Sequence, residues 1–131
     1  MREILFRGKR TDNSEWVYGY VGTAFTIDEN KKVKSRHFTA LDCLGWSSQV
    51  LVSDETIGLY TGLCDKNGTK IFEGDILRDD DNEENGVVEF IDGEFCVVFG
   101  NVETHGIYDI ACCCYVIGNI HDNPELLEGG E

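Results

Sequence analysis

Residues 57–77, IGLYTGLCDKNGTKIFEGDIL, decide the fold of this chain of 131 residues. Asn67-Gly68 predicts a hairpin, because both central residues of a type I′ turn need a positive φ. Glu73-Gly74-Asp75 predicts a sharp turn into a further strand. Glycine and aspartate suit backbone that other residues adopt poorly. The turn-forming residues predicted in this stretch are Gly58, Gly62, Asn67, Gly68, Gly74 and Asp75.

A second hairpin follows from Asp92-Gly93. If these residues form a two-residue loop, Phe90 faces Phe95 across the hairpin. Glu89 and Glu94 then lie on the face opposite to the apolar side chains. The coherent apolar face consists of Val88, Phe90, Phe95, Val97 and Phe99.

Further short strands are predicted on both sides of this region. Residues 111–120 are nearly continuous in apolar side chains and predict a buried strand. Asn123 and Pro124 are typical of a helix start, as N-cap and first residue, so we expect a short terminal helix. The acidic run 79–85 predicts a loop, because such charge density cannot be packed. In the N-terminal part, the expected strands are 4–6, 16–21, 25–27 and 36–38.

The sequence therefore predicts a mainly β, β-rich α+β chain. Residues 56–131 suit a small SH3-like barrel lobe with a C-terminal helical turn. Residues 1–55 suit an N-terminal β-meander lobe, and the two lobes could also form one compact unit.

The net charge of −14 is spread unevenly along the chain. Residues 1–65 carry eight Lys/Arg against nine Asp/Glu, whereas residues 66–131 carry three against sixteen. Such an acidic half repels phosphates, so we expect no direct nucleic-acid binding. No apolar run reaches the length of a membrane span and no signal peptide is visible, so we expect a cytoplasmic protein without membrane contact.

The cysteines and histidines do not form a recognisable site. The six cysteines lack zinc-site spacing, and we expect reduced core thiols rather than disulfides. A Cys–His pair, Cys43 with His37 or Cys114 with His105, is the alternative that only the fold can test. The acidic loop fails the EF-hand pattern, since Glu84 replaces its glycine and Phe90 its final glutamate. We therefore expect no catalytic residue, no metal, no cofactor and no enzymatic activity.

Three segments resemble the YopX family of phage and prophage proteins. They are ILFRGKRTDNSEWVYGY near the start, DETIGLYTGLCDKNGTKIFEGDIL in the middle and VIGNIHDNPELL near the end. The resemblance spans nearly the whole chain and is weakest over residues 25–51. It implies a phage or prophage protein in the host cytoplasm, with an SH3-like lobe, that self-associates as a trimer or a multiple of one.

The sequence is consistent with two candidate functions. The first is a non-catalytic, self-associating binding or assembly module that contacts a host or phage protein. The alternative is an acidic DNA mimic that inhibits a host nucleic-acid-binding protein. Aromatic residues are enriched at interfaces, and the candidates here are Trp16, Tyr18, Tyr20 and Trp46.

Overall fold

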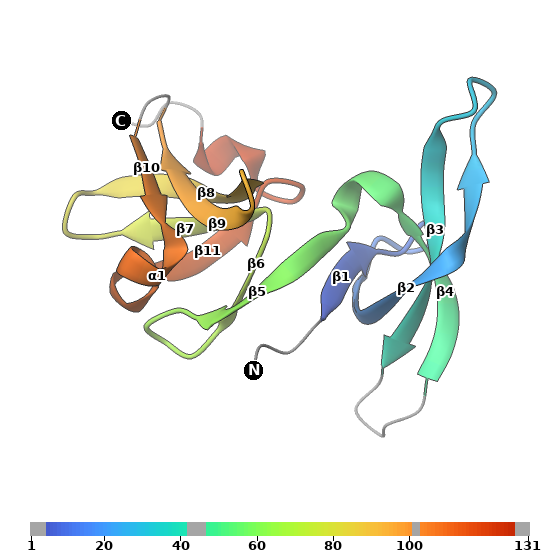
Figure 1. Ribbon diagram of the computed structural model, residues 1–131, viewed down its shortest axis with the longest axis horizontal. Helices are drawn as coiled ribbons and strands as arrows, with labels where there is room; N and C mark the ends of the chain where they lie inside the picture. Colours follow the sequence, from blue (N-terminus) through green and yellow to red (C-terminus); the bar gives the residue numbers. More distant parts are fainter. Residues whose placement is uncertain (1–4, 42–46, 101–102, 128–131) are drawn as a thin grey trace. The chain divides into compact units, whose positions relative to one another are not determined.

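The prediction of a mainly β chain is confirmed (Figure 1). The computed structural model describes residues 5–41, 47–100 and 103–127. These residues form eleven strands, all paired antiparallel, with a few short helical turns. The chain divides into two compact units, Glu3–Leu59 and Tyr60–Glu131 with Met1–Arg2.

The first unit, Glu3–Leu59, is a curled antiparallel sheet with the strand order β4-β3-β2-β1-β5. The Thr11 N–H donates to the Leu51 carbonyl at 3.0 Å, which brings β4 round to the end of β1. Its elements are β1 (Phe6–Lys9), β2 (Trp16–Ile27), β3 (Val33–Leu41), β4 (Ser47–Ser53), the 3₁₀ turn η1 (Asp54–Thr56) and the start of β5 (Gly58–Cys64).

The core of this unit lies on the concave side of the curled sheet. Phe38 and Val52 are completely buried. A Cβ atom on Gly8 would lie 3.1 Å from Val52, so glycine lets β1 and β4 approach closely here.

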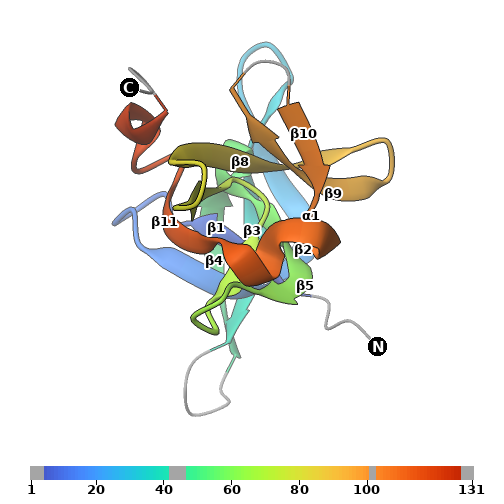
Figure 2. The same cartoon turned by 90° about the vertical axis from the view of Figure 1, so that its left-hand side faces the viewer.

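The second unit contains a five-stranded sheet with the order β10-β9-β8-β7-β11, preceded by the β5–β6 hairpin. This arrangement is compatible with the expected SH3-like barrel. Figure 2 shows α1 continuing from β10 and leading through η2 to β11. The elements are β6 (Lys70–Phe72), β7 (Asp75–Asp79), β8 (Glu84–Ile91), β9 (Glu94–Phe99), β10 (Glu103–Gly106), α1 (Ile107–Ile110), η2 (Ala111–Cys113), β11 (Tyr115–Asn119) and η3 (Pro124–Leu126).

The predicted β8–β9 register is confirmed. Phe90 pairs with Phe95, and Asp92 and Gly93 have φ of 50° and 86°, as a type I′ turn requires. Phe95 is buried, whereas Phe90 is 51 % exposed at the end of the hairpin. The apolar face is therefore continuous but only partly covered.

The predicted strand 111–120 is wrong in its first half. Residues 107–113 are helical, and only Tyr115–Asn119 form a strand. Ile107, Ala111 and Cys114 are buried, and their spacing of four and three residues is that of a helix face. A continuous apolar run conceals this period.

Two smaller predictions also need correction. The loop expected over residues 79–85 is shorter, because Asp79 pairs with Glu84 at the ends of β7 and β8. Charged side chains tolerate this position because the hairpin end is exposed. The terminal helix is a single 3₁₀ turn, and Asn123 makes no side-chain cap bond. Its Oδ1 instead accepts the Asn119 N–H at 3.3 Å.

The Asn67-Gly68 hairpin forms, but its turn is not type I′. Only Gly68 has a positive φ, of 86°. The Asp65 N–H donates to the Thr69 carbonyl, and Asp65 Oδ1 accepts the N–H groups of Asn67 and Thr69. This is a longer loop in which one left-handed residue follows a normal turn.

The β2–β3 loop repeats this turn with a different residue in the left-handed position. Asp28 Oδ1 accepts the N–H groups of Asn30 and Lys32, and Lys31 has a φ of 65°. The same backbone shape is thus built once with glycine and once with lysine. Left-handed backbone strains every residue that has a Cβ.

This repeat gives a matched test of turn strain. Gly68→Ala should lower the free energy of unfolding by about 1 kcal/mol, because its Cβ disfavours the left-handed conformation. Lys31→Gly should change it by less than about 0.5 kcal/mol in the stabilising direction, since relief of strain is offset by greater unfolded-state entropy. Urea unfolding of both variants measures the two values. Equal changes of the same sign in the two unfolding free energies would contradict the view that both positions hold left-handed backbone in the same kind of turn.

Candidate interaction surface

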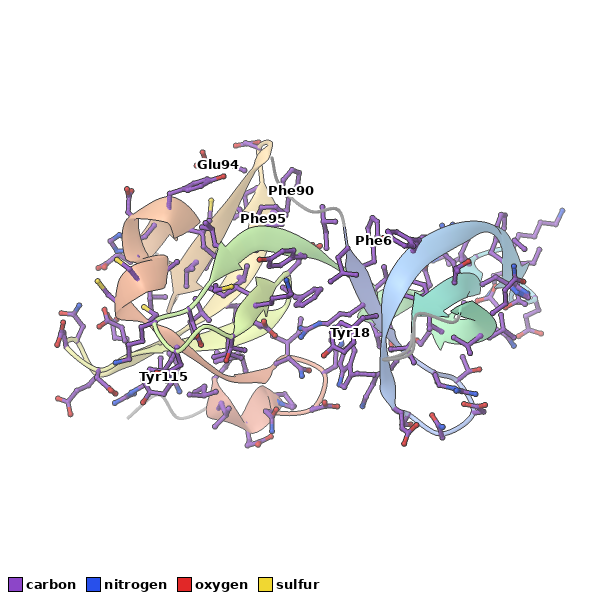
Figure 3. The ribbon with its side chains drawn as sticks, turned by 90° about the horizontal axis from the view of Figure 1, so that it is seen from below. Phe6, Tyr18, Phe90, Glu94, Phe95 and Tyr115 are labelled. Carbon is purple, nitrogen blue, oxygen red and sulfur yellow. The ribbon has the colours of Figure 1, made fainter. Side chains whose placement is uncertain are left out.

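The outer face of β2 carries a row of aromatic side chains. Trp16, Tyr18 and Tyr20 are alternate residues of one strand and therefore lie on the same face. Tyr18 is 43 % and Tyr20 46 % exposed, and Trp16 is half-buried. Phe6 on neighbouring β1 pairs with Gly19 and so lies on the opposite face; Figure 3 labels it with Tyr18.

Two cations from β1 border this aromatic row. Arg7 pairs with Tyr18 and Lys9 with Trp16, which places both on the aromatic face. The Arg7 guanidinium lies 4.8 Å and the Lys9 ammonium 5.8 Å from the centre of the Trp16 ring. Contacts of this kind hold the indole in a fixed orientation. The face therefore combines aromatic rings with the partly exposed Lys9 and the buried Arg7.

Of the four predicted interface aromatics, three share this face. Trp46 lies outside the described residues. Sequence reasoning missed other exposed apolar residues, such as Tyr108, and among them two pairs at the ends of hairpins. Phe25 and Ile27 are 50 % and 49 % exposed near the β2–β3 loop. Phe90 and Ile91 occupy the corresponding position at the β8–β9 loop. Apolar residues directly beside a turn are the signal that could have revealed them.

The remaining predicted turn residues lie in β5 and at the turn that joins β6 to β7. Gly62 and Gly74 both have a φ of 92°. Gly62 lies where the pairing of β5 with β6 shifts its register, as at a β-bulge. Asp75 is buried, and its Oδ2 accepts the Phe72 N–H at 2.8 Å across the Gly74 turn. Gly58 pairs with Arg7 of β1.

Asp65, which was not among the predicted residues, joins two parts of the second unit. Its Oδ1 holds the β5–β6 loop together through the N–H groups of Asn67 and Thr69. Its Oδ2 accepts the Val116 N–H of β11 at 2.8 Å. The carboxylate is buried and satisfies three backbone donors at once. An aspartate two residues before Asn-Gly is the available sequence signal.

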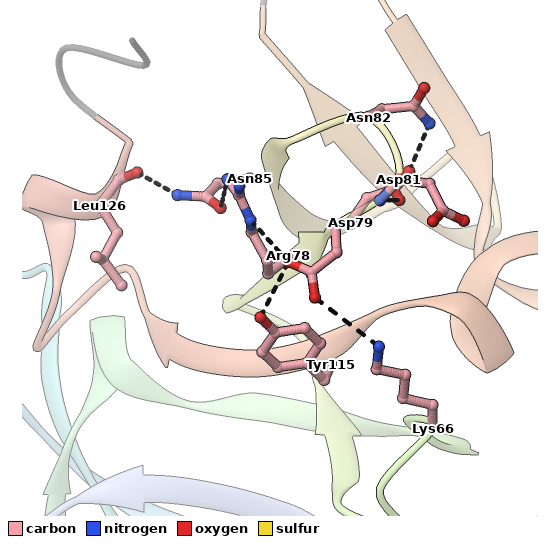
Figure 4. A network of polar contacts seen from close by, with 9 residues as sticks. Lys66, Arg78, Asp79, Asp81, Asn82, Asn85, Tyr115 and Leu126 are labelled. Atoms are coloured by element: carbon pink, nitrogen blue, oxygen red, sulfur yellow. Dashed lines mark hydrogen bonds and ion pairs between the residues drawn. The ribbon is translucent and has the colours of Figure 1, made fainter.

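The acidic β7–β8 loop is tied down by a network of polar contacts (Figure 4). The Asp80 carboxylate accepts hydrogen bonds from Arg78 Nε at 3.3 Å and the Tyr115 hydroxyl at 3.2 Å. Lys66 Nζ lies 4.0 Å from the same carboxylate. The Asp80 carboxylate is therefore engaged by side chains of three other segments.

Asp79, the last residue of β7, forms hydrogen bonds with residues of this loop. Its carboxylate accepts the Asn82 side-chain amide at 2.8 Å and the Asp81 N–H at 3.1 Å. The hydrogen bond from Asn82 is the main reason that the pKa of Asp79 lies below its usual value. These carboxylate oxygens thus stabilise the loop itself. Within the described ranges, no group of three or more His, Cys, Asp or Glu side chains is placed to hold a metal ion.

Only one of the two Cys–His pairs considered from the sequence can be compared with the structure. Cys43 lies outside the described residues, so its pairing with His37 is untested. His105 Nε2 lies 2.9 Å from Glu103 Oε1, and its ring packs edge-on against Phe99. In the part of the chain that the structure describes, no contact joins it to Cys114.

Only some of the cysteines are core thiols, which corrects the sequence-based expectation. Cys96 and Cys114 are buried, whereas Cys64, Cys112 and Cys113 are exposed. Adjacent Cys112 and Cys113 have their Sγ atoms 3.7 Å apart. Their mutual contact raises the pKa of the Cys113 thiol. All five are free thiols.

The buried Cys114 predicts a loss of stability in alkaline solution. Burial raises the pKa of this thiol from 9.0 to about 11. The folded state therefore holds the proton more tightly than the unfolded chain. The thiol's contribution is fully present below pH 9 and is lost as the pH rises toward 11. We expect a loss of about 2 kcal/mol by about pH 10.5.

Cys114→Ala isolates this contribution from other titrating groups. Urea unfolding of the variant and of the unaltered protein should be followed at several pH values. The difference between them should shrink as the pH rises. A difference that stays constant above pH 9 would contradict this pH dependence.

These features define a mainly β protein of two small antiparallel units with exposed aromatic and apolar side chains on its strands. No helix among the described residues is long and apolar enough to cross a membrane. The chain belongs to the YopX family, whose model, described as YopX protein, matches residues 5–128. The crystal structure of protein EF1440 from Enterococcus faecalis is similar to it, with 29 % identity and a TM-score of 0.58. The match covers 98 % of this chain and 100 % of that one. No curated protein matches the chain.

Proposed function

We propose that the protein is a non-catalytic module of a phage or prophage that works in the host cytoplasm by self-association and by binding a protein partner. The observation that carries this proposal is the exposure of large apolar side chains on ordered strands. Tyr18, Tyr20, Phe25 and Phe90 are each exposed by more than two fifths. Exposed apolar area of this kind marks interaction surfaces when it is grouped.

The chemistry of the described side chains supports binding over catalysis. The buried carboxylates of Asp65 and Asp75 are engaged by backbone N–H groups. The exposed histidine His105 contacts a glutamate rather than a nucleophile. Burial raises the pKa of the Cys96 and Cys114 thiols, which suppresses the reactive thiolate.

The DNA-mimic alternative makes a different prediction. A mimic would present its carboxylates as an unpaired row, whereas the Asp79 carboxylate binds Asn82 and the Asp80 carboxylate binds Arg78 and Tyr115. Light scattering on a sizing column at low and high salt separates the two classes. An assembly module should keep its multimer at high salt, because apolar contacts resist screening. A protein that stays monomeric and displaces DNA from a host protein only at low salt would contradict the proposal and support the DNA-mimic alternative.

A further inference from the structure

The β2–β3 hairpin ends in a narrow ribbon with apolar side chains on one face. The pairing of β3 with β4 stops at Ser35, so in the described structure the strand residues beyond it pair only across this hairpin. Phe25 and Ile27 are alternate residues of β2 and are each about half exposed. Two-stranded ribbons are marginally stable in water. A partner that covers these side chains would stabilise the ribbon.

The same ribbon carries an excess of positive charge. Asp28 Oδ1 is occupied by backbone N–H groups of the loop, and Glu29 is the only other acid between residues 25 and 36. Three exposed ammonium groups outnumber them, and none makes an ion pair with a described residue. They belong to Lys31, Lys32 and Lys34. We call residues 25–36 the basic tip.

The β8–β9 hairpin ends in a surface of the opposite charge. Phe90 and Ile91, 51 % and 37 % exposed, lie beside the loop. Among the described residues, no lysine or arginine forms an ion pair with an acid at this end of the hairpin. Its exposed acids are Glu89, Asp92 and Glu94. We call residues 89–94 the acidic tip; Figure 3 shows Glu94 and Phe90 at this end of the hairpin.

We propose that the basic tip of one copy of the chain binds the acidic tip of a second copy. Each tip carries two exposed apolar residues and an excess of one charge, with three exposed lysines on the basic tip and three exposed acids on the acidic tip. Apolar contact between Phe25, Ile27 and Phe90 would supply affinity, while the flanking charges would select the partner and speed its approach. This inference rests on the self-association proposed above and names the surfaces that carry it.

The two tips differ, so the contact is heterologous. Every copy offers one basic and one acidic tip, and each interface uses one of each. Such contacts close into a ring when the rotation between copies permits and otherwise continue as a filament. A ring of three copies is the smallest closed assembly beyond a pair.

Charge reversal at either tip tests the proposal. K32E/K34E makes both tips acidic, and E89K/E94K makes both tips basic. Lys31 and Asp92 are left unchanged because both have a positive φ, so the substitutions avoid left-handed backbone. Sedimentation equilibrium should show self-association weakened at least about tenfold in each variant, because like charges then face each other. An equimolar mixture of the two variants should associate again, since each offers the charge that the other lacks.

Matched controls keep the outcome clear. D81K/E125K reverses two exposed acids outside both tips, with Asp81 at the opposite end of β8 from the acidic tip, and should leave self-association unchanged. Thermal unfolding should show that all variants fold. If the unaltered protein forms multimers but both tip variants do so equally well, the tips are the wrong surfaces and the proposed function stands. If the unaltered protein is monomeric at every concentration, both proposals fail.

Discussion

Gly86→Ala should lower the free energy of unfolding by about 3 kcal/mol, because β8 has no room for a methyl group at this position. A Cβ atom there would lie 2.6 Å from Val97 Cγ1 and 2.8 Å from Phe99 Cδ1. Both neighbours are buried in the core of the second unit. The added carbon must therefore displace packed side chains or the strand itself.

Gly106→Ala is the matched control for this substitution. Its Cβ would lie 3.7 Å from the nearest atom, an Asp109 carboxylate oxygen, which is an ordinary contact. We expect a change below about 1 kcal/mol, set mainly by backbone entropy. Chemical denaturation measures both values. Similar losses for the two alanines would show that steric crowding at Gly86 is absent.

Asp65→Ala should cost about 3 kcal/mol, because three backbone N–H groups lose a charged acceptor at once. One of them is the Val116 N–H, which links the β5–β6 loop to β11. Asp65→Asn should cost less, since an amide oxygen still serves Asn67 and Thr69. Its NH₂ group cannot accept the Val116 N–H.

Asp28→Ala provides the comparison at the equivalent turn of the first unit. Asp28 Oδ1 accepts two backbone N–H groups in an exposed loop, and water can replace it there. We expect a loss of about 1 kcal/mol. Hydrogen exchange at the Val116 amide should accelerate in Asp65→Ala and not in Asp28→Ala. Unchanged protection of the Val116 amide in both variants would contradict the conclusion that Asp65 links the β5–β6 loop to β11.

Local sequence signals predicted the hairpins well because register follows from turn length and alternation. A two-residue loop at Asp92-Gly93 pairs Phe90 with Phe95, and β8 and β9 have this register. Asn67-Gly68 marked a hairpin correctly but not its turn type. The side chain of Asp65, two residues earlier, competes for the loop's N–H groups and favours the longer loop.

The helical segment before β11 could not be separated from a strand by apolar content. Ile107, Ala111 and Cys114 are spaced as on a helix, but all positions between them except Asp109 also hold apolar or aromatic residues. The aromatic row was visible in Trp16, Tyr18 and Tyr20, because alternation alone places them together. The two charged tips could not be recognised in the sequence, since their exposure depends on where the neighbouring strands stop pairing.

The central claim is that this chain assembles with itself through its exposed apolar strand ends. Sedimentation velocity of the full chain over a wide concentration range tests it most directly. We expect a species several times heavier than 14.7 kDa whose share grows with concentration. A single 14.7 kDa species throughout that range would contradict the account.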